Sequence, residues 1–298
     1  MLGHAAMGNA GRTRKSPAQQ EIERYLCTGE HDALFFGWPG ENFVACAQNG
    51  DAALRTALIS AVRERTAHAT MPAALAGIDA VALTRAKVGP MVRGLFPAAE
   101  RATVLDVLGR SMVFLTPAAI ETVLGQTDWL STAWNLANLY LASAGAQPLS
   151  RDAPSIVGLS EGTTCYVSAE YFRENGRFDD FVVHEAAHVF HNCKRRTIGL
   201  REIRGRDWLL EIDFRKRETF AYACEAYSRV LELGDDRPAR KMLMPQIESG
   251  PMPTDDGVDA AEYLDILREA VAGRNGWKHI LERCSAPRQK RPRRLGAA

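Results

Sequence analysis

The chain has 298 residues, of which 37 are basic and 36 acidic, so its formal net charge is only +1. Hydrophobic residues make up 46% and charged residues 24%, which is the balance of a folded globular protein and excludes a largely disordered chain. The near-zero charge gives no overall field that would attract nucleic acid or an acidic substrate.

The two ends of the chain are basic and are predicted to be disordered tails, over residues 1–16 and 285–298. The first twenty residues lack the apolar run of a secretory signal, and no stretch approaches eighteen uninterrupted apolar residues. We therefore expect a cytoplasmic protein that makes no membrane contact. The six cysteines form no CxxC pair, so we interpret them as buried thiols rather than a zinc ribbon or a disulfide framework.

Helical patterns dominate residues 17–150, which we interpret as a helical lobe. Asp51 is a predicted N-cap for a helix over 52–69, and Thr116 followed by Pro117 predicts the start of another helix. A further helix is predicted to begin near Thr127 and to end at Gly145.

The sequence changes character between residues 145 and 154, where proline, glycine and serine separate short apolar runs. This change predicts a lobe boundary, with a second lobe over 151–284. The segments 155–159 and 163–168 are strand-like, and Glu161 with Gly162 can join them as a hairpin.

Helices are predicted to follow this hairpin. Asp179 or Asp180 can cap a helix that ends near Asn192, and a long helix is predicted over 213–233, with two shorter ones over 258–273 and 276–284. The expected fold class is α+β, mostly α-helical, with a helical N-terminal lobe followed by a lobe that has a small sheet and a metal-binding helix.

The pattern HExxH, formed by His184, Glu185 and His188, lies in the first of these helices. Four helical residues turn the chain by about 400°, so the two imidazoles lie about 40° apart on one face and can bind one metal ion. Glu185 is rotated by about 100° from His184, so it is placed to act on a metal-bound water as a general base rather than to bind the metal. The alanines between the histidines allow a second helix to approach closely.

This constellation resembles the zincin metallopeptidases, and specifically the gluzincin branch, over residues 163–233. The resemblance implies a Zn²⁺ cofactor, a third ligand that is a glutamate on a later helix, and a strand over 163–168 that lines the substrate cleft. The metzincin pattern fails, because His191 stands where that pattern has glycine and Lys194 where it has the third histidine.

Two glutamates on the helix over 213–233 qualify as the third ligand that the resemblance implies. Glu218 is preferred because it lies near the start of that helix, whereas Glu225 lies two turns further along nearly the same face. Glu225 is either the alternative ligand or a hydrogen-bond partner that orients one. His191 is too far along the helix axis from His184 to join the same site. Tyr222 and Tyr227 either polarise a substrate carbonyl, as tyrosines of the zincins sometimes do, or are aromatic residues of the core.

These features predict a zinc-dependent hydrolase, specifically a peptidase that acts on a peptide or protein substrate. Glu185 is its expected catalytic base, and His184, His188 and Glu218 are its expected metal ligands. The alternative hypothesis is a non-hydrolytic metal-binding module, regulatory or structural, that contacts nucleic acid through its basic tails.

Overall fold

The computed structural model of the protein describes residues 15–32, 37–70, 73–75, 77–153, 158–172, 176–203 and 206–285. Within these residues the chain is mostly helical and carries one small sheet, so the expected α+β, mostly α-helical class is confirmed. Most of the two predicted tails, residues 1–14 and 286–298, lies outside the described residues, as does the 155–157 part of the first predicted strand.

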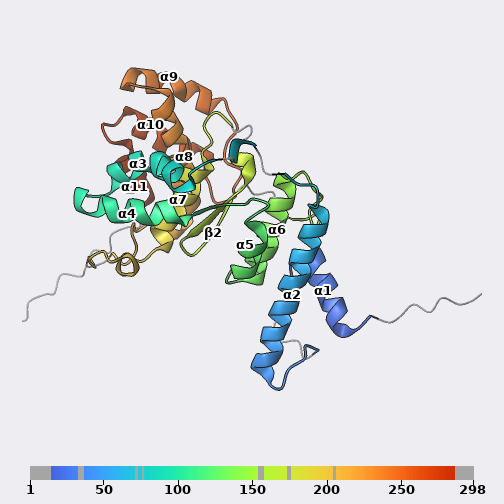
Figure 1. The fold of residues 1–298 in the computed structure, drawn as a ribbon. Helices are drawn as coiled ribbons and strands as arrows, with labels where there is room; N and C mark the ends of the chain where they lie inside the picture. Colours follow the sequence, from blue (N-terminus) through green and yellow to red (C-terminus); the bar gives the residue numbers. More distant parts are fainter. Residues whose placement is uncertain are drawn as a thin grey trace, which may run out of the picture.

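Helices come first in the chain and strands interrupt them twice (Figure 1). The elements before residue 150 are α1 (Pro17–Thr28), α2 (Phe43–Arg65), α3 (Ala80–Leu95), α4 (Ala98–Ser111), β1 (Met112–Phe114), α5 (Ile120–Gln126) and α6 (Leu130–Ser143). Those after it are β2 (Gly158–Glu161), β3 (Thr164–Val167), α7 (Phe181–Asn192), α8 (Arg217–Leu233), α9 (Arg237–Glu248), α10 (Ala260–Ala272) and α11 (Gly276–Cys284).

The sheet has the strand order β1-β3-β2, with β1 parallel and β2 antiparallel to β3. The predicted hairpin is therefore present in its described part, and Gly162 takes the positive φ of 60° that its turn requires. β1 has no counterpart among the predicted strands, because a three-residue strand between two helical patterns carries too little alternation to be recognised.

Alternation along β3 places the sheet between two hydrophobic cores. Cys165 and Val167 are buried in the larger core, whereas Tyr166 between them is buried in the smaller one. This is the period-2 geometry of a strand that has both faces covered. The larger core contains α7 and α8, so one face of the hairpin is fixed against the helix that carries the HExxH pattern.

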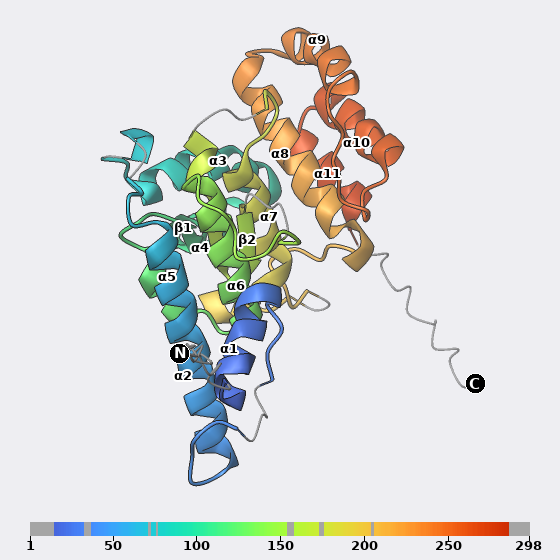
Figure 2. The same cartoon turned by 90° about the vertical axis from the view of Figure 1, so that its right-hand side faces the viewer.

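The two cores do not follow the chain boundary expected near residue 150. Helices α3 and α4 come from the first half of the sequence but pack with α7, α8 and α11 in the larger core. The smaller core joins α1, α2, α5 and α6, and the start of α2 projects beyond the other helices (Figures 1 and 2). Apolar periodicity in the sequence indicates that one face of a helix is buried, but it does not indicate in which core that face lies.

Several helix starts differ from the predicted ones by one or more turns. α2 begins eight residues before Asp51, because Asn42 caps it by accepting from the Ala45 N–H at 3.0 Å, while the Asp51 carboxylate pairs with Arg55. Thr116 accepts from the Ala119 N–H at 3.2 Å, but this bond starts a turn and α5 begins after it. Helix α9 was not predicted.

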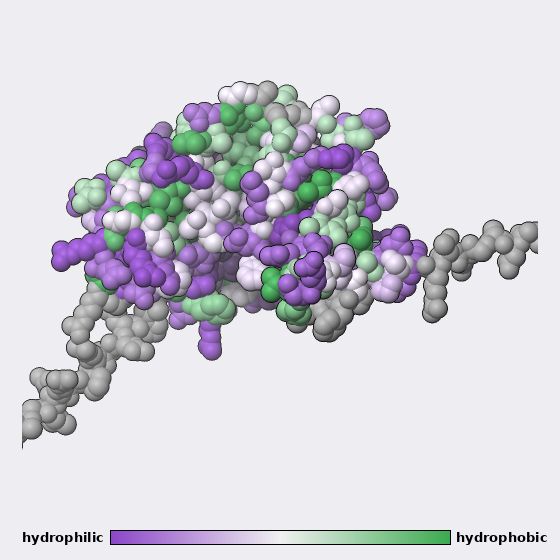
Figure 3. Space-filling view, turned by 60° about the horizontal axis from the view of Figure 1, so that its bottom comes forward, coloured by the Kyte–Doolittle hydropathy of each residue, from purple (hydrophilic) through white to green (hydrophobic). Residues whose placement is uncertain are grey.

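On the molecular face shown in Figure 3, hydrophilic residues are interspersed with small groups of apolar ones. Among the described residues, none of the helices has the length and apolar character needed to cross a bilayer. Four of the six cysteines are buried as expected, but Cys27 is exposed and Cys46 is half-buried. All six are free thiols.

Candidate metal centre

The HExxH pattern lies on α7, whose start is fixed by the side chain of Asp180. Asp180 is the N-cap and accepts from the Val183 N–H at 3.3 Å, which resolves the choice between Asp179 and Asp180. Ala186 and Ala187 are completely buried, and α7 packs directly against α8. Because α7 and α8 are in direct contact, side chains from both helices can reach one point.

The structure brings His184, His188 and Glu218 together into one cluster, with one ligand atom from each within 4.8 Å of the others. Glu218 Oε2 lies 3.8 Å from His184 Nε2 and 3.6 Å from His188 Nε2. Donors that bind zinc at about 2.1 Å with tetrahedral angles lie roughly 3.4 Å apart, so both distances from Glu218 are within a few tenths of an ångström of the spacing in a zinc site. The two-histidine, one-glutamate donor set is also the set found in catalytic zinc sites.

Glu225, the alternative third ligand, is engaged elsewhere in the structure. One of its oxygens, Oε2, lies 3.0 Å from His184 Nδ1, and the other, Oε1, accepts the Asp180 N–H at 2.7 Å. With Nδ1 held in this way, the Nε2 atom of His184 is directed to Glu218. A carboxylate on the far nitrogen of a ligand histidine fixes the ring orientation and increases the basicity of the ring.

Glu185 lies under the edge strand β2 and is only 6% exposed. Ser160 donates a hydrogen bond to Glu185 Oε2 at 2.5 Å, and Gly158 runs so close that a Cβ there would lie 2.5 Å from Glu185 Oε1. Ser160 and Gly158 lie on the same face because they are two residues apart on a strand. Sequence reasoning missed both, since nothing in the local pattern shows which face of β2 meets α7.

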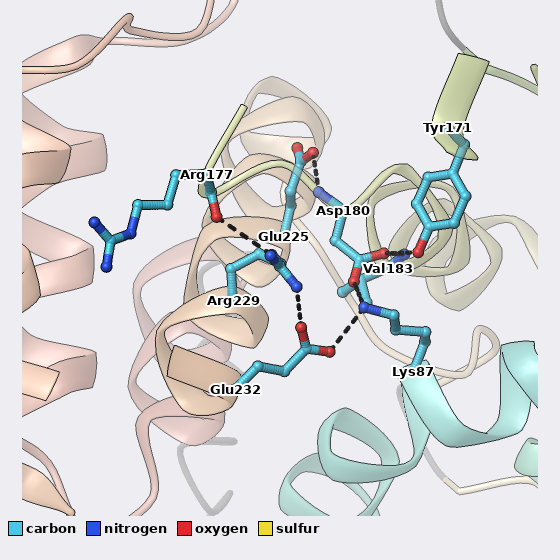
Figure 4. A network of polar contacts seen from close by, with 8 residues as sticks. All are labelled: Lys87, Tyr171, Arg177, Asp180, Val183, Glu225, Arg229 and Glu232. Carbon is cyan, nitrogen blue, oxygen red and sulfur yellow. Dashed lines mark hydrogen bonds and ion pairs between the residues drawn. The ribbon is translucent and has the colours of Figure 1, made fainter. Parts of the chain in front are cut away.

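At the start of α7, a charged network connects this helix to α3 and α8 (Figure 4). Lys87 Nζ lies 2.9 Å from Asp180 Oδ2 and 2.8 Å from Glu232 Oε1, and Glu232 also pairs with Arg229. Tyr171 donates to Asp180 Oδ1 at 3.2 Å. Asp180 is fully buried, so these partners compensate a carboxylate that solvent does not reach.

Tyr222 lies beside the cluster, and its ring centroid is 4.6 Å from that of His184. Tyr227, by contrast, is buried against Trp277 in the larger core. His191 is outside the cluster, as its distance along α7 predicts, but it is only 4% exposed. Among the described residues its Nδ1 atom has no hydrogen-bond partner.

Burial and mutual repulsion shape the electrostatics of the cluster. Burial raises the pKa of Glu218 and of Glu185, against the opposing effect of the His184 charge on both. Burial alone would lower the pKa of His184, but the hydrogen bond and charge of Glu225 raise it to about 9. Burial and the nearby His184 hold the pKa of His188 well below its usual range. The carboxylates of Glu185, Glu218 and Glu225 surround the two imidazoles, and a divalent cation would stabilise their negative charge.

Comparison of the chain with protein-family models, with curated proteins and with solved structures found no match. The geometry of the cluster and the chemistry of its residues therefore indicate what the protein does.

Proposed function

We propose that the protein is a zinc-dependent hydrolase of the gluzincin type and that it cleaves an amide bond in a peptide or protein. The observation that carries the proposal is the convergence of His184 Nε2, His188 Nε2 and Glu218 Oε2 from two packed helices. Each of these atoms is a donor that zinc accepts, and three protein ligands leave a fourth position for water or substrate.

Glu185, Ser160 and Glu225 have distinct roles in the proposed reaction. When bound, zinc supplies Lewis acidity that polarises the amide carbonyl and lowers the pKa of water. Glu185 removes the proton from the attacking water and later delivers it to the departing amine. Ser160 holds the Glu185 carboxylate through its hydrogen bond, and Glu225 holds the ring of His184 in the ligand orientation.

Burial suits Glu185 to this role. A buried carboxylate has a raised pKa, which makes it a stronger base than an exposed glutamate and moves its titration closer to neutral pH. The packing of Gly158 against it also restricts the carboxylate to a narrow position.

Metal content and peptide cleavage, measured on the same preparations, test the proposal. The preparations are wild-type protein, His188→Ala, Glu218→Ala and Glu185→Gln, purified without a histidine tag or chelator and analysed by elemental mass spectrometry. We expect about one zinc per chain in the wild type and in Glu185→Gln, and loss of zinc in the other two variants. Cleavage of a peptide library should be present only in the wild type.

Two outcomes would contradict the proposal. Wild-type protein without zinc would remove its basis. Stoichiometric zinc without hydrolysis of any peptide would favour the non-hydrolytic metal-binding module.

A further inference from the structure

A cavity of about 390 Å³ lies next to the metal centre, between the start of α7 and helices α8, α9 and α10. Its size falls in the range of ligand pockets, which is roughly 300–1,000 Å³. Aromatic and aliphatic side chains form most of its wall, including Phe178, Phe181, Tyr263, Ile247 and Met252.

Two residues connect the cavity directly to the metal cluster. Tyr222 lines the cavity and packs against the His184 ring with centroids 4.6 Å apart. Glu225 also lines it and holds His184 Nδ1 at 3.0 Å. The cavity is therefore separated from a metal ligand by the thickness of one side chain.

The segment between α9 and α10 forms part of the cavity wall through residues 250–254. The charge of the next residue, Asp255, contributes to the raised pKa of Glu218 and of Tyr222, although burial is the larger cause for both.

The charged groups that line the cavity either have partners or lie at its rim. Both oxygens of Glu225 already accept hydrogen bonds, and Asp179 Oδ2 accepts the Gly176 N–H at 2.9 Å. Arg177 and Gln246 are exposed, so they lie at the rim rather than in the interior. An apolar group is the occupant that this lining favours.

We propose that the cavity receives the side chain of a large apolar or aromatic residue of the substrate, adjoining the amide bond that is cleaved. This inference rests on the proposed hydrolase function and specifies its substrate class. Tyr222 lies between the His184 ring and the cavity, so a side chain next to the reacting carbonyl has to pass this ring to enter the cavity, which a long side chain such as Phe or Leu can do. Alanine at the same position would leave most of the cavity unfilled.

Cleavage of matched peptides by zinc-loaded protein tests the inference. The peptides have one sequence, with Phe, Leu or Ala placed in turn at each position, and mass spectrometry identifies the bond that is cut. We expect kcat/KM next to Phe or Leu to exceed that next to Ala by about tenfold or more. Met252→Trp fills the cavity and should reduce this preference to about threefold or less, with the Ala peptide unaffected.

Two further variants separate filling of the cavity from damage to the fold. Gln246→Trp introduces the same ring from the exposed rim and should also reduce the preference. Met242→Trp makes the same change as Met252→Trp at a position of α9 that is 73% exposed, so it should retain the wild-type preference. Zinc content should be equal in all of these proteins.

A binding measurement tests the cavity without hydrolysis. N-acetyl-phenylalanine amide and N-acetyl-alanine amide are titrated into metal-free Glu185→Gln protein and followed by NMR. We expect the phenylalanine amide to bind more tightly, and Met252→Trp in the same background to weaken it at least about fivefold. If the wild type cleaves no peptide, the proposed hydrolase function fails. The titration alone then decides whether the cavity binds a large apolar side chain.

Either of two results would overturn the inference. One is equal cleavage next to Phe and Ala by the wild type, and the other is equal binding of the two amides.

Discussion

Lys87 makes a buried ion pair with Asp180, the N-cap of α7, and removing Lys87 tests how much this pair stabilises the protein. It comes from α3, about a hundred residues before the HExxH pattern, and reaches Asp180 Oδ2 at 2.9 Å. Burial alone would lower the pKa of Lys87, but the charges and hydrogen bonds of Asp180 and Glu232 more than offset this and raise it. The lysine is therefore charged at neutral pH, opposite a carboxylate that is fully buried.

Replacing Lys87 with Met keeps the length of the side chain but leaves Asp180 without its positive partner. Removing one member of a buried ion pair costs about 3 kcal/mol or more, because the remaining charge is buried and uncompensated. Glu232 retains Arg229, so it contributes little to this cost. At about 2 °C per kcal/mol for a chain of this size, the melting temperature should fall by roughly 6 °C.

Thermal and urea unfolding of Lys87→Met, Asp180→Asn and the double variant measure the effect. Asn at position 180 can still accept from Tyr171 and Val183 but carries no charge, so the double variant should lose clearly less stability than the sum of the two single variants. Lys241→Met, on the exposed surface of α9, is the matched control and should change stability by less than about 0.5 kcal/mol. Additive losses in the double variant would refute the idea that Lys87 compensates the Asp180 charge.

Three further predictions concern the metal and its base. Glu225→Gln should weaken zinc binding by about 10- to 100-fold in a competition titration with a chromogenic chelator, because the His184 ring loses its charged partner; unchanged affinity would contradict this role. Gly158→Ala should reduce peptide hydrolysis by at least about tenfold while zinc content stays constant, since the new Cβ displaces the Glu185 carboxylate. Gly125→Ala, where nothing lies within 4 Å of the added Cβ, is its control and should retain full activity. Chelation with EDTA should lower the melting temperature of the wild type, since zinc at 100 times its Kd adds about 2.7 kcal/mol of stability, and should leave His188→Ala unchanged.

Local sequence patterns were sufficient to predict features that lie within a single helix or hairpin. The spacing of His184 and His188 places them on one face of α7, and the hairpin turn at Gly162 follows from the backbone preferences of a few residues. The local pattern limited the cap of α7 to Asp179 or Asp180, and the structure shows that it is Asp180. The helices α10 and α11 were likewise predicted close to their observed bounds. These features depend on interactions between residues three to five positions apart, so they can be inferred from the sequence alone.

Helix starts and strand partners were less predictable, because competing local signals are resolved by packing. Asp51 has the character of a cap, yet the chain is already helical before it and Asn42 serves as the cap. β1 is a strand because it pairs with β3, about fifty residues later in the chain, and not because of its own three residues.

The HExxH spacing on a predicted helix was enough to propose a metal site with two histidine ligands and a neighbouring acid. The tertiary structure was needed to show that Glu218, and not Glu225, lies near Nε2 of both histidines, because the two glutamates occupy nearly the same face of α8 and differ in how far along its axis they meet α7. The tertiary structure also introduced Ser160, Gly158 and Lys87, which act on α7 from other elements. Helical periodicity fixes the face on which a side chain lies, whereas contacts between distant elements depend on how those faces pack together.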